Sequence, residues 1–227
     1  MSEPISNNLF IAERRVTFPG KDATPSSNPR RAAAEALEAV ANKPPGNPAD
    51  DRCLFRNIRA DLAAQNGQWG RQGFWALVVY RFGRWRYTIR FTPLRKLASL
   101  VYRILYKLVQ ILAGIDLPCE VRVGHNFVID HYGGVVISGY SEFGDNCRIR
   151  NGVVVGLSQV DDPCAPRIGD NVDIGAGAKV LGRIVIGDNV QIGANAVVVR
   201  DVPANSIAVG VPAVIKPRRG ARLRLAQ

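Results

Sequence analysis

The residues best suited to chemistry in this sequence are a histidine and the carboxylate directly before it. The chain holds two histidines, His125 and His131, and Asp130 immediately precedes the second. A neutral imidazole can take a proton from a hydroxyl nucleophile, and a positioned base of this kind contributes about 10²–10⁴ in rate. An adjacent carboxylate can hold the ring tautomer and stabilise the imidazolium. We therefore expect His131 to be a catalytic general base, with Asp130 as its catalytic partner.

The sequence has few residues suited to a metal site or a disulfide framework. Two histidines exclude a metal site built from three imidazoles of one chain, and we expect no metal. The four cysteines form no CxxC pair, so neither a disulfide framework nor a zinc ribbon is expected, and a reducing cytosol is the default compartment. The alternative interpretation of His131 is a corner histidine bonded to backbone. His125 lacks a carboxylate before it and is expected at the surface.

An aliphatic residue recurs every six positions through the second half of the chain. The row comprises Ile168, Ile174, Val180, Ile186, Ile192 and Val198, and glycine follows it at 169, 175, 187 and 193. The same register continues upstream through Ile137, Phe143, Ile149 and Val155, and after a slip of two residues through Ile129 and Val123. Such regularity indicates a repeat architecture.

A period of six fits neither an α-helix nor a simple alternating strand. Each unit makes one short strand and one corner, and three units close a triangular coil of about 18 residues. The aliphatic side chain points inward, where full burial is worth roughly 1.5–3 kcal/mol. We attribute the following glycine to corner dihedrals that a Cβ would resist. The sequence thus predicts a mainly β fold, a left-handed parallel β-helix of hexapeptide repeats preceded by a small helical N-terminal segment.

The slip in the repeat coincides with the candidate base. Neighbouring side chains of a flat strand point to opposite sides, so Asp130 and His131 cannot face one site within a regular strand. The slip is followed by Gly133 and Gly134. We expect a local bulge here that turns both side chains outward.

The chain divides into four parts by composition. Residues 1–50 hold seven of the fourteen prolines and are expected to be a disordered arm. Residues 51–116 are expected to be a helical cap, residues 117–215 the β-helix, and residues 216–227 a basic C-terminal tail. The formal net charge of +11 favours an acidic partner, but no nucleic-acid binding is expected.

One amphipathic helix is expected over residues 93–113, with proline at its first turn and Gly114 at its end. Its apolar face comprises Leu97, Leu100, Val101, Ile104, Leu105, Leu108, Ile111 and Leu112. Between Arg81 and Lys107 there are eight basic residues and no acidic one. We expect this helix to cap the first coil, and peripheral contact with an anionic membrane is the second interpretation. Charges near its centre argue against a membrane-spanning helix.

Two stretches, 121–140 and 166–217, resemble the hexapeptide-repeat acyltransferases, nearest the serine acetyltransferase-like branch that includes colanic-acid-type polysaccharide O-acetyltransferases. The run GAGAKVLG and the later GVPA carry the resemblance. It implies a homotrimer with active sites between subunits and acetyl-CoA as co-substrate. The family's catalytic pair falls on Asp130 and His131. Its CoA contacts fall on Gly175, Ala176, Gly193, Ala194, Lys216 and Arg218.

The sequence also departs from serine acetyltransferases, which carry an Arg-His pair before a Pro-Lys-Ile. Cys164 and Ala165 occupy those positions here, and neither can bind a carboxylate. We therefore expect an O-acetyltransferase acting on a small-molecule or lipid-linked sugar in exopolysaccharide biosynthesis. Asp161 and Asp162 are expected to bond sugar hydroxyls, or else to be plain loop solvation.

Two alternatives stay open. The first is a serine O-acetyltransferase that makes O-acetyl-L-serine for cysteine biosynthesis, with Arg148 or Arg150 as the carboxylate anchor. The second is a non-catalytic trimeric scaffold. The expected location is the cytoplasm, with the inner face of the membrane as a further option.

Overall fold

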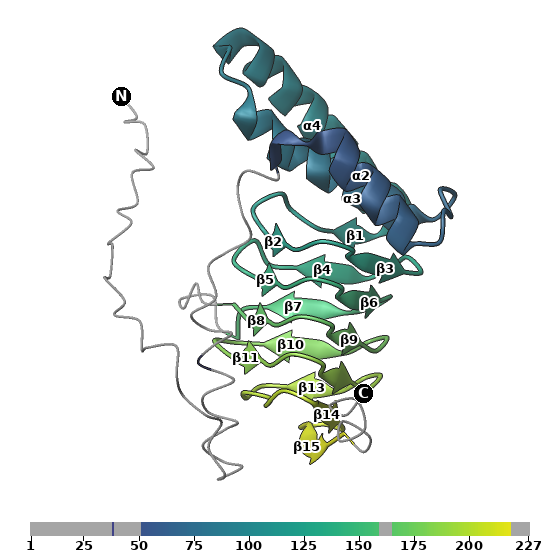
Figure 1. The fold of residues 1–227 in the computed structure, drawn as a ribbon, viewed down its shortest axis with the longest axis vertical. Helices are drawn as coiled ribbons and strands as arrows, with labels where there is room; N and C mark the ends of the chain where they lie inside the picture. The colour runs from purple at the N-terminus through teal and green to yellow at the C-terminus, as the bar shows by residue number, and fades with distance from the viewer. Residues whose placement is uncertain (1–37, 39–50, 159–164, 219–227) are drawn as a thin grey trace, which may run out of the picture.

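Three helices stand on one end of a tall stack of short strands (Figure 1). The computed structural model describes residues 38, 51–158 and 165–218. The helices are α2 (Leu54–Ala64), α3 (Gln72–Trp85) and α4 (Thr92–Ala113), with a short 3₁₀ turn, η2 (Arg86–Thr88), between the last two. The predicted arm, apart from residue 38, and the tail beyond Arg218 lie outside the described residues.

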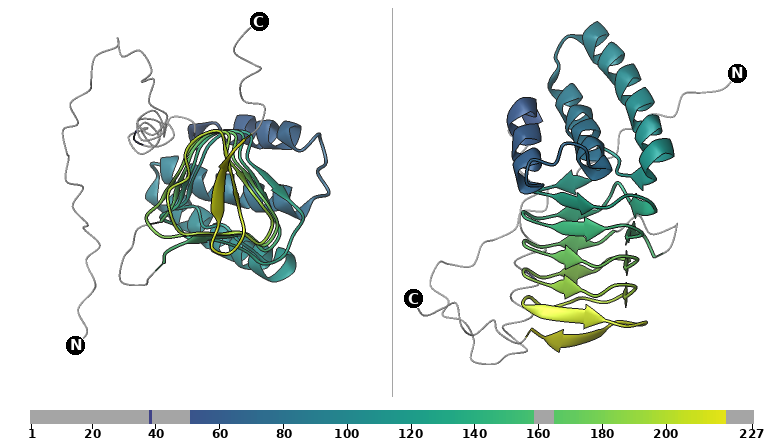
Figure 2. Two further views of the ribbon diagram at one scale, coloured as in Figure 1. Left: turned by 90° about the horizontal axis from the view of Figure 1, so that it is seen from below. Right: turned by 90° about the vertical axis from the view of Figure 1, so that its right-hand side faces the viewer.

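The strands form the three faces of a triangular prism, which is evident when the molecule is viewed along its length (Figure 2). Face 1 comprises β1 (Ile115–Asp116), β4 (Val135–Ile137), β7 (Val154–Gly156), β10 (Lys179–Leu181) and β13 (Val197–Val198). Face 2 comprises β2 (Arg122–Val123), β5 (Glu142–Phe143), β8 (Arg167–Ile168) and β11 (Val185–Ile186). Face 3 comprises β3 (Val128–Asp130), β6 (Arg148–Arg150), β9 (Asp173–Ile174), β12 (Gln191–Ile192), β14 (Ser206–Val209) and β15 (Val214–Pro217).

The register confirms the predicted hexapeptide coil. Ile174 pairs with Ile192, and Val180 pairs with Val198, so the chain returns to the same face after eighteen residues in this part of the coil. The inner row is buried from Ile129 to Val198, and a second buried row lies four residues further on, as at Val172 and Val190. A mainly β, left-handed parallel β-helix after a small helical segment is therefore confirmed.

Two coils are longer than eighteen residues. Ile129 pairs with Ile149, whereas Ile137 pairs with Val155, so two extra residues lie in the corner between β3 and β4. This is the predicted slip. A longer insertion separates β7 from β8, and within it residues 159–164 lie outside the described residues.

The physical reason that we gave for the repeat glycines is wrong. Gly175 and Gly187 do not have positive φ; instead, a Cβ on either would collide with backbone of the next coil, at Ala194 and Ala204 respectively. Left-handed φ falls on asparagines at the corner between faces 2 and 3: Asn126, Asn146, Asn171, Asn189 and Asn205. Asparagine tolerates the left-handed conformation, so these corners do not need glycine. Glycine at positions such as 175 and 187 is needed instead for clearance between coils.

The predicted cap is also corrected. α4 has the expected bounds, with Pro93 in its first turn and Gly114 at φ 61° after its end. Yet α3 supplies the buried side chains that join the coil core, among them Leu77 and Tyr80. The large aliphatic residues of α4 are exposed, and its packed side is the narrow row Ala98, Tyr102 and Ala113. The helix that covers the first coil is therefore α3.

Candidate active site

The edge where face 3 turns into face 1 carries His131. Residues 131–134 form this corner in the first complete coil, and we call the edge that continues below it the His131 edge. Backbone hydrogen bonds run down this edge: Gly152 N–H to Gly133 O (2.9 Å), Gly177 N–H to Asn151 O (2.9 Å) and Asn195 N–H to Ala176 O (2.8 Å). The structure thus stacks the predicted base above the predicted donor-binding residues.

His131 is exposed and has φ 66°. The residues after it include Gly133 at φ 97° and Gly134 at φ 68°. The chain therefore makes this corner with a series of left-handed residues, where we had predicted a bulge. Histidine is among the residues enriched in this conformation. The result is an imidazole at the outside of a corner rather than in a strand.

Asp130 has different surroundings, because it belongs to β3. Its side chain is only 12% exposed, and its two oxygens accept hydrogen bonds from Arg71 Nη1 and Arg148 Nη1, both at 2.8 Å. No hydrogen bond joins Asp130 to His131 within the part of the chain that the structure describes. The predicted pair is thus adjacent in the chain, but the carboxylate is held by two arginines.

The N-terminus of α3 explains how Arg71 reaches this carboxylate. Gly73, in the first turn, lies so close to β3 that a Cβ there would collide with the carbonyl of Ile129. Arg71 directly precedes α3 in extended conformation and lies over the outer side of face 3. Glycine at 73 is therefore what lets the helix approach the strand.

The two arginines proposed as carboxylate anchors lie on β6, directly below β3. Their side chains share the outer side of face 3, because residues two apart in a strand point the same way. Arg148 pairs with Asp130, and its side chain is 44% exposed. Arg150 pairs with Asp173 on β9, and this carboxylate raises the pKa of the guanidinium against the opposing effect of burial. Arg148 is the one of the two that joins the network beside His131.

The lower part of the His131 edge offers free backbone amides. Within the described residues, no acceptor is found for the N–H groups of Ala176 and Ala194, although Gly175, Gly177 and Asn195 all donate to neighbouring coils. Lys179 Nζ donates to Gly152 O (2.7 Å) and Gly177 O (3.0 Å), and so binds two layers of the edge together. Small residues with unused amides can bind the carbonyl groups of an extended ligand.

Lys216 and Arg218 lie elsewhere on the molecule. β15 returns antiparallel to β14 and places Lys216 opposite Ile207 on face 3. Arg218 N–H donates to Asn205 O at 2.9 Å, and its Nη1 approaches Asn189 O at 3.4 Å, at the corner between faces 2 and 3. Within one subunit they are not on the His131 edge. Asp161 and Asp162 lie outside the described residues.

Three residues with structural roles escaped the sequence analysis: Arg71 and Lys179 near this site, and Tyr106 on α4. Arg71 is distant in sequence from Asp130, and no local pattern links them. Lys179 directly follows the GAGA run, so its position beside the predicted CoA-binding residues could have been predicted from the sequence. The Tyr106 hydroxyl donates to the Asp116 carboxylate and fastens α4 to β1. Burial and this hydrogen bond both raise the pKa of Tyr106, so the hydroxyl stays protonated.

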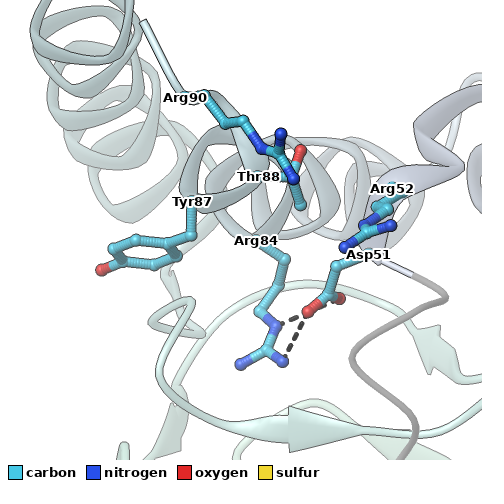
Figure 3. A pocket seen from close by; sticks show the side chains of 6 residues that line it. All are labelled: Asp51, Arg52, Arg84, Tyr87, Thr88 and Arg90. Atoms are coloured by element: carbon cyan, nitrogen blue, oxygen red, sulfur yellow. Dashed lines mark hydrogen bonds and ion pairs between the residues drawn. The ribbon is translucent and has the colours of Figure 1, made fainter. Parts of the chain in front are cut away.

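A separate pocket of about 570 Å³ opens in the helical segment (Figure 3). It is lined by Asp51, Arg52, Arg84, Tyr87, Thr88 and Arg90. Arg84 is held by Asp51 through Nε (3.2 Å) and Nη2 (2.7 Å). This pocket contains no histidine and none of the predicted site residues.

Within the described residues, no group of three or more His, Cys, Asp and Glu side chains is arranged to hold a metal ion. Of the described helices, none is long and apolar enough to cross a membrane.

A coil of hexapeptide repeats is the fold of one class of bacterial transferases. Residues 165–200 match the bacterial transferase hexapeptide family (six repeats). The chain is 39% identical to serine acetyltransferase of Synechococcus elongatus over 179 residues, which cover 77% of this chain and 69% of the relative. It is 38% identical to serine acetyltransferase of Helicobacter pylori strain J99, covering 70% of this chain and 92% of the relative.

Solved structures agree with these relatives. Neisseria gonorrhoeae serine acetyltransferase superposes with a TM-score of 0.63 at 29% identity, covering 85% of this chain and 74% of that one. The soybean apoenzyme gives a TM-score of 0.60 at 29% identity, covering 72% of this chain and 69% of that one. The chain belongs to the serine acetyltransferase family. The predicted enzyme class, an O-acetyltransferase, is confirmed, and acetyl-CoA is the co-substrate of this family.

The relatives also bear on the choice between serine and a sugar as the acceptor. They favour the alternative, serine acetylation, over the main expectation of a sugar in exopolysaccharide biosynthesis. The polysaccharide branch of the resemblance, a lipid-linked acceptor and the inner membrane face receive no support from them.

Proposed function

We propose that this protein transfers the acetyl group of acetyl-CoA to the hydroxyl of serine, making O-acetyl-L-serine. The observation that carries the proposal is the kinship with serine acetyltransferases over most of the chain, at 38–39% identity. The exposed imidazole above a row of small residues supplies a site that suits this chemistry.

His131 acts as the base in this proposal. One ring nitrogen takes the proton of the serine hydroxyl while the hydroxyl oxygen attacks the thioester carbonyl carbon. The carbon–sulfur bond then breaks, and the imidazolium returns the proton to the departing CoA sulfur. The products are O-acetylserine and CoA, and the imidazole ends as it began.

The donor lies along the His131 edge in this proposal. The amides of Ala176 and Ala194 lack acceptors in the described part of the chain, and the pantetheine arm of CoA offers carbonyl groups to receive them. Gly175 and Gly193 keep the two coils close and the edge free of bulky side chains. Lys216 and Arg218, on other parts of the same subunit, stay predictions as contacts for the CoA phosphates.

Arg148 is the proposed anchor for the serine carboxylate. The Arg-His pair of the family is replaced by Cys164 and Ala165, so the carboxylate needs another cation. Arg148 donates one N–H to Asp130, and its side chain is 44% exposed, so its other N–H groups can donate to a bidentate acceptor. Asp130 then serves as a positioning residue, because it holds Arg71 and Arg148 in place.

The expected assembly is a homotrimer in the cytoplasm. Hexapeptide-repeat acetyltransferases are typically trimeric, and the flat faces of the prism suit side-by-side packing. A trimer can bring residues of one subunit, such as Lys216, toward the His131 edge of another. Asp161 and Asp162 stay predictions as acceptor contacts.

One assay tests the acceptor. Purified full chain with acetyl-CoA is given L-serine, or in parallel a panel of free sugars, and the released CoA thiol is measured. We expect thiol release that depends on serine, with O-acetylserine identified by mass spectrometry. Release with a sugar and none with serine would overturn serine as the substrate and restore the sugar hypothesis. D-serine is the matched control, since it carries the same groups in the other configuration.

A further inference from the structure

α4 presents three different stripes along its 22 residues, and one of them, which is apolar, has no partner among the residues that the structure describes. Successive residues turn about 100° around a helix, so the stripes can be read from the sequence and checked against burial. The first stripe, Ala98, Tyr102 and Ala113, is buried against α3 and the coil. The other two stripes face away from the molecule.

The unpartnered stripe is broad and strongly apolar. It comprises Leu94, Leu97, Leu100, Val101, Ile104, Leu105, Leu108, Ile111 and Leu112, each between 36% and 75% exposed. Figure 2 shows α4 at the outer edge of the helical segment, with α3 between it and α2, so neither helix covers this face. An exposed apolar surface of this extent marks an interaction site.

A basic stripe borders the apolar one. Lys96, Arg103 and Lys107 project side by side, next to Leu100 and Ile111 on the helical wheel, and all three are exposed. No acidic residue occurs in α4 or anywhere from Arg81 to Lys107. The partner of this surface must therefore accept aliphatic side chains and carry negative charge along one margin.

Charge decides between two partners. A second copy of α4 would bring the same cations toward the seam, and α4 has no acidic residue to pair with them. The apolar stripe is also wider than the narrow two-position seam of a coiled coil. A membrane rich in anionic lipid meets both requirements, because acyl chains receive the aliphatics while phosphates lie beside the cations.

We propose that α4 is an interfacial helix that docks this enzyme on an anionic membrane surface. The helix lies in the plane of the interface, with its nine aliphatic side chains below the headgroups and Lys96, Arg103 and Lys107 among the phosphates. It does not span the bilayer. This inference is independent of which hydroxyl the enzyme acetylates.

The test is co-sedimentation of the purified full chain with lipid vesicles. Vesicles of phosphatidylcholine alone are compared with vesicles that also contain phosphatidylglycerol, at low salt and with added NaCl. We expect binding to the anionic vesicles that weakens with salt, and little binding to the neutral ones. Equal binding to both vesicles, or none at low salt, would overturn the proposal.

Two double variants locate the surface. R103Q/K107Q is expected to weaken partition roughly 25-fold, since each lost cation contributes about five-fold, whereas R122Q/R200Q on the coil removes the same charge without effect. I104S/L108S is expected to weaken partition onto anionic vesicles about tenfold or more. The control V199S/V214S, on the coil, is expected to leave partition unchanged. Circular dichroism checks that every variant is folded.

A second copy on α4 is the competing outcome. Light scattering without lipid would then show I104S/L108S as a smaller assembly than the wild type, and vesicles would bind neither. That result would reject the membrane proposal. Unchanged assembly size together with lost vesicle binding supports it.

Discussion

Asp130 and His131 follow each other in the chain, but their backbones differ and so do their surroundings. Asp130 is a strand residue under the N-terminus of α3, and its oxygens are taken by Arg71 and Arg148. His131 has left-handed φ and stands outside the corner. The type and order of the two residues were enough to select His131 as a candidate base. The arginines that hold Asp130 could not be found in the same way, because only the fold brings them together.

Arg148 gives a prediction at the scale of single residues. If it anchors the serine carboxylate, Arg148→Gln removes a charge-assisted hydrogen bond and raises the KM for serine roughly tenfold or more, with a smaller change in kcat. Steady-state kinetics at saturating acetyl-CoA measure both constants. Arg148→Lys keeps the charge and is expected to recover part of the loss.

The matched control for this variant is Arg122→Gln. Arg122 is a similarly exposed arginine on face 2, paired with Glu142, and away from the His131 edge. Its loss is expected to leave the KM for serine unchanged. An unaltered KM in Arg148→Gln would remove this residue as the anchor and leave Asp130 without its proposed positioning role.

At the scale of elements, the hexapeptide row predicted the coil and its buried residues from Ile129 to Val198. It did not give the reason for glycine at the following position. The spacing of the aliphatic residues indicates which side chains point inward. The clearance at Gly175 or Gly187 depends instead on the backbone of the next coil. The left-handed asparagines, such as Asn171, recur once in each coil at the corner between faces 2 and 3, and that signal was present in the sequence.

Clearance between coils predicts a stability difference between two glycines. In Gly187→Ala the new Cβ would meet the backbone of Ala204 in the next coil, so the free energy of unfolding should fall by roughly 1–3 kcal/mol. Gly70→Ala is the control, because no heavy atom lies within 4 Å of its Cβ position. Urea unfolding monitored by circular dichroism measures both, and equal stabilities would contradict the clearance argument.

The bounds of α4 were also predictable, because proline at its start and glycine after its end are local signals. The side that it turns to the protein was not. Periodicity indicates that one face of a helix is apolar, but it does not say which molecule covers that face. Here the coil is covered by α3, and the broad face of α4 is left exposed.

At the scale of the whole molecule, the coil aligns residues from successive turns along one edge of the prism. His131, Ala176 and Ala194 are far apart in the chain, yet successive turns place them at one corner. The period therefore accounts for the shared corner of these residues, whose functional roles stay predictions. The period could not predict where Lys216 and Arg218 lie, because β15 reverses direction and leaves the repeat. The flat faces and the exposed stripe of α4 are the two surfaces through which the molecule is expected to meet its partners.

The most direct test of the account is the replacement of His131 by alanine, with His125→Ala as the matched control at a different corner. His125 is exposed and contacts Asp145, so its loss should leave the reaction intact. In His131→Ala, we predict that serine-dependent formation of O-acetylserine falls by about 10²–10⁴, while the affinity for CoA measured by calorimetry is unchanged. Acetyl transfer at the wild-type rate in His131→Ala would contradict the account.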